Sequence, residues 1–245
     1  MKWRLAYSKI GKIRFLGHLD MARVWERALR RTDVPVSMSS GFTPRPKVSF
    51  GLALPTGAES LVELLDVVVD DSFSFGDEVL SALTNALPEG VTVNEARPSI
   101  NGVSLQEDVV ATTWVIALDD SDIVSSVERL ARSTECFVER ERKGERRRDD
   151  IRPGILHLAE CRDDEARRLS SLGWQAEGVL VTAMLTTSGR GIRPTELVEA
   201  LVPGAEPWVT MTRVIRTHQW INDAGQHVDV LTGEPGIESL ATVIA

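Results

Sequence analysis

The sequence predicts an α+β protein in which two ferredoxin-like halves follow one another, each a β-α-β-β-α-β unit with two helices on an antiparallel sheet. Strand-like and helix-like patterns alternate in this order over residues 1–97, and they do so again over residues 110–221. Residues 97–109 between them are rich in Pro, Ser, Asn, Gly and acidic residues, a composition typical of a linker. A chain of 245 residues accommodates two domains of roughly 100 to 130 residues, each with a core of its own.

The first half opens with a strand and then the clearest helix of the chain. Trp3, Leu5 and Tyr7 occupy every second position, which predicts a half-buried strand. A turn at 9–12 follows, and residues 13–16 are expected either to extend this strand or to pair with it. Residues 19–32 predict an amphipathic helix, because apolar side chains fill one half of its helical wheel and arginines the other.

The remainder of the first half completes the expected order. A short strand at 34–38 is placed near a sheet edge because it contains a proline. Further along the chain, the patterns predict an extended segment at 47–54, an apolar strand at 61–69, a helix at 75–87 capped near Ser74, and a strand at 91–96.

The second half repeats the order with an insertion. Its expected elements are a strand at 114–118, a helix at 122–132, a second strand at 136–138, a helix at 165–172 within the insertion, a strand at 178–186, a helix at 195–201 that begins at Pro194, and a final strand at 208–217. Residues 222–245 are polar and rich in glycine, and we expect a C-terminal tail there.

Positive charge is concentrated at the N-terminus. The first fifty residues carry eleven Lys/Arg against three Asp/Glu, a local charge of +8, whereas the whole chain carries −8 and the other 195 residues therefore −16. A solvated face is the usual meaning of such a cluster. Its density in an otherwise acidic chain equally indicates a docking surface for a polyanion.

The arginines of the 19–32 helix are the first candidate contacts. Arg23, Arg27 and Arg30 follow one another at spacings i, i+4 and i+7, and Arg31 lies beside them. Guanidinium groups suit phosphate because they donate two parallel hydrogen bonds and stay charged. Arginines on an exposed helix are also common, and Glu26 with Arg30 forms an ordinary i, i+4 pair.

A stretch rich in glycine and proline supplies the next candidates. Pro44 and Pro46 stiffen the chain and hold Arg45 and Lys47 out in an extended conformation. Phe42 offers a face on which a base could stack. The alternative is a rigid structural turn in which Phe42 belongs to the core.

Two further groups of residues are weaker candidates. His18 lies at a predicted helix N-terminus and could act as a general acid or base, yet no nucleophile or metal triad accompanies it, which favours a structural or ligand-contacting histidine. The run 139–152 is nearly balanced in sign and is expected to be an exposed loop. Its cations are a candidate second contact surface: Arg146, Arg147, Arg148 and Arg152.

Little in the sequence indicates catalysis, a metal or a cofactor. It contains no P-loop, no Rossmann glycine pattern, no HExxH and no nucleophile elbow. Cys136 and Cys161 are far apart and neither belongs to a C-x-x-C pair, so no zinc or iron–sulfur site is expected from this chain alone. Without a signal peptide or a long apolar run, the sequence predicts a soluble cytoplasmic protein that does not enter a membrane.

The N-terminal motifs resemble those of the radical-SAM-associated (radical-SAM-linked) family, a domain of unknown function found beside radical SAM proteins or fused to them. The segments that carry this resemblance are 13–20 (IRFLGHLD), 26–31 (ERALRR), 41–50 (GFTPRPKVSF), 55–60 (PTGAES) and, in the second half, 149–152 (DDIR). Gly17 stands where a serine is expected, which weakens the case for a hydroxyl contact there, and the basic loop is less rich in lysine.

The resemblance implies an accessory, non-catalytic role beside a radical SAM partner, because the chain lacks the C-x-x-x-C-x-x-C motif for the cluster. Two hypotheses follow. The protein binds RNA, such as tRNA or rRNA, through its N-terminal basic face, or that face docks directly on the radical SAM enzyme without RNA. A metal-free RNA endonuclease that uses His18 is a distant third, because it rests on fold analogy alone.

Overall fold

The computed structural model describes residues 1–99, 104–120, 122–142 and 145–235. It is a mixed α+β protein whose strands pair mostly antiparallel. The chain divides into two compact units, Met1–Asp108 and Val109–Ala245. The division falls inside the segment 97–109, whose composition predicted a linker.

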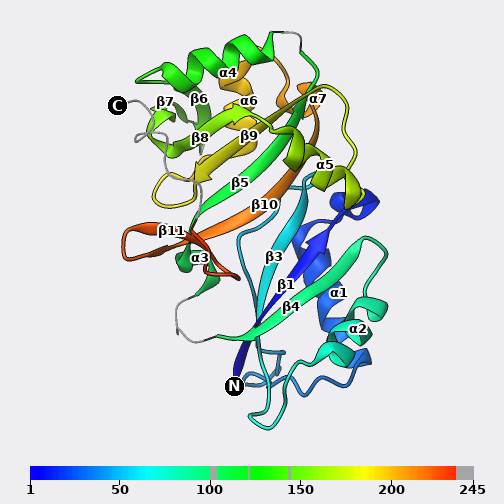
Figure 1. The fold of residues 1–245 in the computed structure, drawn as a ribbon. Coiled ribbons are helices and arrows are strands. Elements are labelled where there is room, and N and C mark those ends of the chain that lie inside the picture. The colour runs from blue at the N-terminus through cyan, green and yellow to red at the C-terminus, as the bar shows by residue number, and fades with distance from the viewer. Residues whose placement is uncertain (100–103, 121, 143–144, 236–245) are drawn as a thin grey trace. The chain divides into compact units, whose positions relative to one another are not determined.

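The first unit is built on four strands in the order β4-β1-β3-β2, in which all neighbours are antiparallel (Figure 1). Trp3 of β1 faces Val67 of β3, and Val48 of β2 faces the same residue. The elements of this unit are β1 (Lys2–Lys9), the 3-10 helix η1 (Gly11–Phe15), α1 (His18–Arg31), β2 (Val48–Phe50), β3 (Glu59–Val68), α2 (Asp77–Ala86), β4 (Val91–Pro98) and α3 (Leu105–Asp108).

The core of the first unit lies between its sheet and the helices α1 and α2. Met21, Trp25, Ala28 and Leu29 of α1 are buried, as the amphipathic pattern predicted, and they pack with alternate residues of β1, β3 and β4. The ring of Trp25 meets Tyr7 edge to face, with centroids 4.9 Å apart. Burial of this apolar stripe leaves the arginines of α1 on the solvent side.

The prediction of a half-buried first strand is wrong, because both faces of β1 are covered. Arg4, on the face away from α1, is only 8 % exposed. Its Nε donates to Asp66 Oδ1 and its Nη1 to Asp108 Oδ2, both at 3.0 Å. A buried cation is tolerated when its charge is paired in this way, so a polar residue in the alternation did not mean an exposed one.

Other expectations for the first half also need correction. Residues 13–16 neither extend β1 nor pair with it, because they belong to η1 and to its end, where Lys9 Nζ donates to the carbonyl of Leu16 at 2.7 Å. Residues 34–38 make only single bridges, Val36 with Val69 and Met38 with Pro46. The N-cap of α2 is Gly76 and not Ser74.

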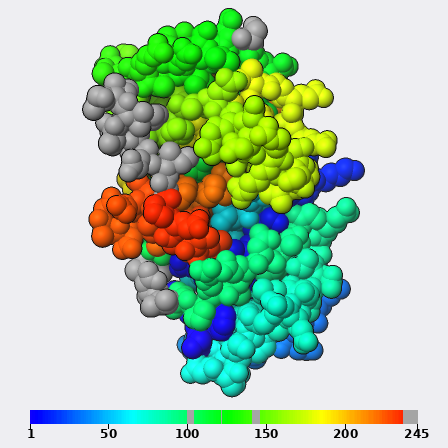
Figure 2. All heavy atoms as spheres, in the orientation of Figure 1, coloured from blue at the N-terminus to red at the C-terminus, as the bar shows by residue number. Residues whose placement is uncertain are grey.

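The second unit has a sheet in the order β10-β5-β9-β8 with β11 beside β10, and a separate hairpin of β6 and β7. In Figure 2 the β10–β11 hairpin, drawn orange to red, lies at the surface of this unit. The elements are β5 (Val109–Leu118), α4 (Ile123–Arg132), β6 (Phe137–Arg142), β7 (Glu145–Asp150), the 3-10 helix η2 (Arg152–Gly154), β8 (Ile155–Glu160), α5 (Asp163–Ser171), β9 (Val179–Thr186), α6 (Pro194–Leu201), α7 (Pro207–Thr210), β10 (Met211–Asp223) and β11 (Gln226–Asp229).

The insertion of the second half is more regular than the sequence predicted. The segment 136–138 does not join the main sheet; it leads into the β6–β7 hairpin, and β8 takes the place beside β9. The charged run expected to be a loop forms this hairpin. The final strand begins at Met211, after the short helix α7, and β11 forms within the expected tail, of which residues 236–245 lie outside the described part.

Within the described residues, every helix is too short or too polar to cross a lipid bilayer.

Candidate functional site

The glycine- and proline-rich stretch folds into a small hairpin, Ser37–Lys47, here called the Gly-Pro loop. The amide of Ser39 donates to the carbonyl of Arg45 at 2.8 Å, and the amide of Lys47 to the carbonyl of Ser37 at 2.8 Å. The carbonyl of Lys47 also accepts from Val68 at 3.0 Å, which joins the base of the loop to the end of β3. Gly41 supplies a φ of +135°, open mainly to glycine.

The side chain of Phe42 is completely exposed at the tip of the Gly-Pro loop, at 110 % of its reference area. The alternative in which Phe42 belongs to the core is therefore wrong. Arg45 and Lys47 are exposed on the same loop. Backbone hydrogen bonds at the base thus hold one bare aromatic ring and two cations on a single narrow projection.

The four arginines of α1 are exposed, and their contacts are weak. Arg23 Nη1 lies 2.9 Å from Asp20 Oδ1, an ion pair in which both side chains face solvent. Arg27 Nε donates to the carbonyl of Arg23 at 3.1 Å. Exposed pairs of this kind contribute at most about 1 kcal/mol, so a phosphate group can replace them.

The two arginines in the last turn of α1, Arg30 and Arg31, differ in their contacts. Arg31 Nη1 reaches the carbonyl of Ala86 at the end of α2, at 3.4 Å. The side chain of Arg30 makes no hydrogen bond or ion pair with any residue that the structure describes, and the expected Glu26–Arg30 pair is absent from this set. Arg30 is therefore the arginine of α1 most available to a ligand.

His18 connects the start of α1 to the strand after the Gly-Pro loop. It is the first residue of the helix and is exposed, and its ring packs edge to face on Phe50 with centroids 5.5 Å apart. The N-terminal end of a helix carries partial positive charge, which favours an anion nearby. The contact with Phe50 places the His18 ring against β2.

Part of the N-terminal positive charge is not available at the surface. Arg4 is paired internally, as described above, and Lys9 is only 4 % exposed, with burial lowering the pKa of its ammonium group. Lys2 Nζ lies 3.3 Å from Asp66 Oδ2. The local charge of +8 therefore overstates the surface charge, and the exposed cations lie mainly on α1 and the Gly-Pro loop.

The candidate contacts in the second unit fall into two classes. Arg146, Arg147 and Arg148 are exposed on β7, and the guanidinium of Arg148 lies over the ring of Phe137 at 4.3 Å. Arg152 is structural, because its Nε, Nη1 and Nη2 donate to the carbonyls of Ser133, Ile155 and Ala131 at 2.9, 2.9 and 3.0 Å. We therefore leave Arg152 out of any binding surface.

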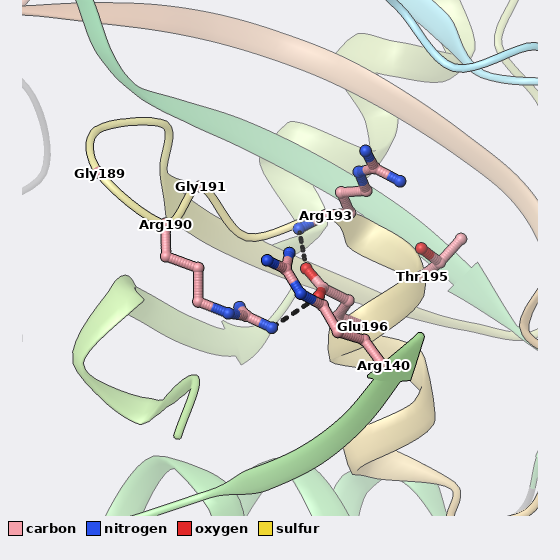
Figure 3. A pocket seen from close by; sticks show the side chains of 7 residues that line it. All are labelled: Arg140, Gly189, Arg190, Gly191, Arg193, Thr195 and Glu196. Atoms are coloured by element: carbon pink, nitrogen blue, oxygen red, sulfur yellow. Dashed lines mark hydrogen bonds and ion pairs between the residues drawn. The ribbon is translucent and has the colours of Figure 1, made fainter. Parts of the chain in front are cut away.

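Sequence reasoning missed a pocket of about 550 Å³ in the second unit, here called the arginine pocket (Figure 3). Residues far apart in sequence form it, so no local pattern indicated a site; the segment 189–191 (GRG), two glycines around an arginine, was the available signal. Its lining residues are Arg140, Gly189, Arg190, Gly191, Arg193, Thr195 and Glu196.

Comparison with known proteins identifies a matching family, but the description of that family names no activity. Residues 2–194 match the family model DUF2344, described as an uncharacterized protein conserved in bacteria. No curated protein matches the chain. Among solved structures, an unknown protein from Galdieria sulphuraria is similar over 76 % of this chain and 79 % of its own, at 15 % identity and a TM-score of 0.25, which is too weak to support an argument.

Proposed function

Since the chain belongs to DUF2344, a family of uncharacterized proteins conserved in bacteria, its function must be argued from its own surface, and we propose that it binds RNA. The binding surface is the exposed part of the N-terminal charge cluster, here called the basic face. It consists of His18, Arg23, Arg27, Arg30, Arg31, Phe42, Arg45 and Lys47.

The observation that carries this proposal is the complete exposure of Phe42 beside two cations on a loop whose backbone is held. Exposing the apolar ring of phenylalanine to water is unfavourable, and contact with a binding partner removes this cost. A nucleic-acid base can stack its flat face on such a ring, and the phosphates of the RNA backbone can pair with Arg45 and Lys47. The exposed arginines of α1 are a second group of cations in the same unit, and they would contact further phosphates of a longer RNA.

A second candidate is docking on a protein, and two exposed apolar side chains favour it. Phe15 of η1 is 62 % exposed and Leu19 of α1 is 74 % exposed, and both flank His18 in sequence. Apolar anchors among arginines are typical of protein interfaces. The resemblance of the N-terminal motifs makes a radical SAM enzyme the partner to test first.

We also propose that both units are ferredoxin-like, as the tandem prediction has it. The strand orders β4-β1-β3-β2 and β10-β5-β9-β8 support this proposal, since they correspond position by position when β6, β7 and α5 are treated as insertions. An experimental structure would test it, and a different strand order in either unit would contradict it.

The experiment is a fluorescence anisotropy titration of labelled single-stranded RNA and of a tRNA transcript with the full chain. Phe42→Ala, Arg30→Ala and Arg45→Ala are each expected to weaken binding, the first by the loss of a stacked base worth about 1–3 kcal/mol. The control is Arg132→Ala, because Arg132 is an equally exposed helix arginine paired with an acid, Glu128, at 3.6 Å.

Circular dichroism of each variant excludes unfolding as the cause. Unchanged affinity in all three variants would remove the basic face as the RNA site. If the wild type binds no RNA but a radical SAM protein copurifies with it and is lost in the same variants, docking replaces RNA binding. RNA cleavage by wild type that disappears in His18→Ala would instead support an endonuclease.

A further inference from the structure

We propose that the arginine pocket of the second unit binds a phosphate-type oxyanion, either inorganic phosphate or the terminal phosphate of a nucleotide chain. This inference concerns a site separate from the basic face and does not rest on RNA binding there. It follows from three arginines that line one pocket, from how the donors of two of them are used, and from the backbone around them.

The three arginines come from separate segments. Arg140 lies on β6, Arg190 in the loop between β9 and α6, and Arg193 at the N-cap of α6. Figure 3 shows the side chains of Arg140 and Arg190 approaching each other beside Glu196. Guanidinium groups repel one another, so bringing them to one pocket requires opposite charge there.

Two carboxylates supply part of that charge and hold Arg190 in place. Arg190 Nε donates to Asp149 Oδ2 and its Nη2 to Glu196 Oε1, both at 2.8 Å. The remaining oxygen of Glu196, Oε2, accepts from the amide of Arg193 at 3.0 Å. Arg140 and Arg190 lie beside these two carboxylates, whereas the side chain of Arg193 extends away from them in Figure 3, so its positive charge in the lining is not balanced by Asp149 or Glu196.

The donors of the arginines are not all used. Nη1 of Arg190 is buried and has no hydrogen-bond partner, and Nε of Arg140 has only a 3.4 Å ion-pair contact with Asp149 Oδ2. Arginine cannot avoid the cost by losing its proton, and a buried charged donor without an acceptor is destabilising. These two nitrogens therefore lack a hydrogen-bond acceptor within the described part of the chain.

The local backbone also favours an anion. Gly189 has a φ of +62°, and a Cβ at Gly191 would lie 3.1 Å from the carbonyl of Thr187, so the loop passes close to the end of β9. The pocket opens at the N-terminus of the eight-residue helix α6, where Thr195 lines it. Helix dipole and guanidinium charge act in the same direction, and a tetrahedral oxyanion meets both.

The test is isothermal titration calorimetry of the full chain with inorganic phosphate at low chloride. A second arm compares a dinucleotide that carries a 5′-phosphate with the same dinucleotide carrying a 5′-hydroxyl. Tighter binding of the phosphorylated dinucleotide than of inorganic phosphate identifies a nucleotide terminus as the source, and the reverse identifies the free ion.

The variants are Arg193→Gln and Arg140→Gln, with Arg162→Gln as the control because Arg162 is a surface arginine of the same unit that pairs with Asp164. We expect phosphate affinity to fall by about tenfold to a hundredfold in each pocket variant and not in the control. Phosphate should raise the melting temperature of the wild type and raise it less in the variants.

Two results would overturn the proposal. If the folded wild type binds neither phosphate nor the phosphorylated dinucleotide at millimolar concentration, the free donors are hydrated and the cluster only anchors the β6–β7 hairpin. If phosphate binds equally to the wild type and to both pocket variants, it binds elsewhere. Because the test uses no contact of the basic face, either result leaves the RNA proposal standing on its own experiment.

Discussion

At the scale of single residues, buried charge is the feature with the largest consequence for stability. Arg4 is the partner of two carboxylates, Asp66 and Asp108, and Asp66 is itself only 4 % exposed. Removing the cation leaves the buried Asp66 with Lys2, whose Nζ lies 3.3 Å from Oδ2, as its remaining ion-pair partner among the described residues. Such an uncompensated charge destabilises a protein more than loss of the pair as a whole does.

We therefore predict that Arg4→Met lowers the free energy of unfolding by about 3 kcal/mol or more. The double variant Arg4→Met, Asp66→Leu should recover part of that loss, since it removes the buried charge of Asp66 but leaves Asp108, 12 % exposed, without its arginine partner. Urea denaturation measures both. Replacement of an exposed pair, as in Arg132→Ala, should cost less than about 1 kcal/mol. A double variant as unstable as the single one would show that packing, not charge, determines the effect.

Two histidines of the second unit, His157 and His218, have lowered pKa values in the folded protein, so we expect its stability to depend on pH. Burial lowers the pKa of His218, a shift that Arg168 adds to and that Asp229 and Glu165 oppose. Burial, followed by Arg162, also lowers the pKa of His157. The unfolded chain then binds protons at a higher pH than the folded chain does. Protonation of the unfolded chain therefore favours unfolding as the pH falls below about 6.5.

The expected result is a loss of stability as the pH falls from about 6.5 to the lower pKa values of the folded histidines, and little change from these two groups above that window. His157→Gln and His218→Gln should each make this part of the profile flatter. Denaturant midpoints across the range measure it. A profile whose slope below pH 6.5 is unchanged in both variants would mean that carboxylates determine the acid response.

At the scale of elements, one glycine joins the end of β1 to the start of β4. Gly90 has a φ of +88°, and its carbonyl accepts from the amide of Ile10 at 2.8 Å. A Cβ at Gly90 would lie 2.2 Å from the carbonyl oxygen of Ile10. Gly173, after α5, has nearly the same φ, +84°, but open space around it.

Comparing Gly90 with Gly173 separates two costs of adding a Cβ, the strain of a left-handed backbone and the overlap with neighbouring atoms. Gly173→Ala should cost only the strain of a left-handed residue, about 1–2 kcal/mol. Gly90→Ala should cost clearly more, because the two strand ends must move apart. Urea denaturation of both variants is the measurement, and equal costs would mean that the strand ends yield without loss.

The elements that could be predicted are those with a clear pattern of apolar residues. The helix α1 and the strands β3, β5 and β9 follow from periodicity alone. The β6–β7 hairpin did not, because charged residues occupy most of its positions, with Glu139 opposite Arg148 and Arg140 opposite Arg147 across the two strands. A run of charged residues has no apolar periodicity, so the sequence alone predicts a loop, and the strand is recognised only from its pairing in the structure.

The candidate site shows the same division. The arginines of α1 could be placed on an exposed face, since the apolar half of the helix had to be buried. The position of Phe42 could not, because an aromatic ring fits a core as well as a ligand and only tertiary structure decides between them. The arginine pocket joins Arg140 to residues 189–196, a distance along the chain that no local pattern spans.

At the scale of the whole molecule, the charge is divided unequally. The chain carries −8 in total, although its first fifty residues carry +8, and internal pairing removes Arg4 from that surface. An acidic remainder repels nucleic acid, so we expect extended RNA contact only where exposed cations gather, as on the basic face. Binding confined to a few cations has a measurable consequence in its dependence on salt.

If the basic face binds single-stranded RNA through Arg23, Arg27, Arg30, Arg45 and Lys47, about five phosphates release counterions. The logarithm of the association constant should then fall with the logarithm of salt concentration with a slope of about −3.5. Each of Arg30→Ala and Arg45→Ala should reduce the magnitude of that slope by about 0.7, because one phosphate contact is lost. Phe42→Ala should lower affinity at every salt concentration and leave the slope unchanged, because stacking releases no counterion. Anisotropy titrations over a salt series measure all four proteins, and a slope that stays the same in the arginine variants would place the phosphates on other cations.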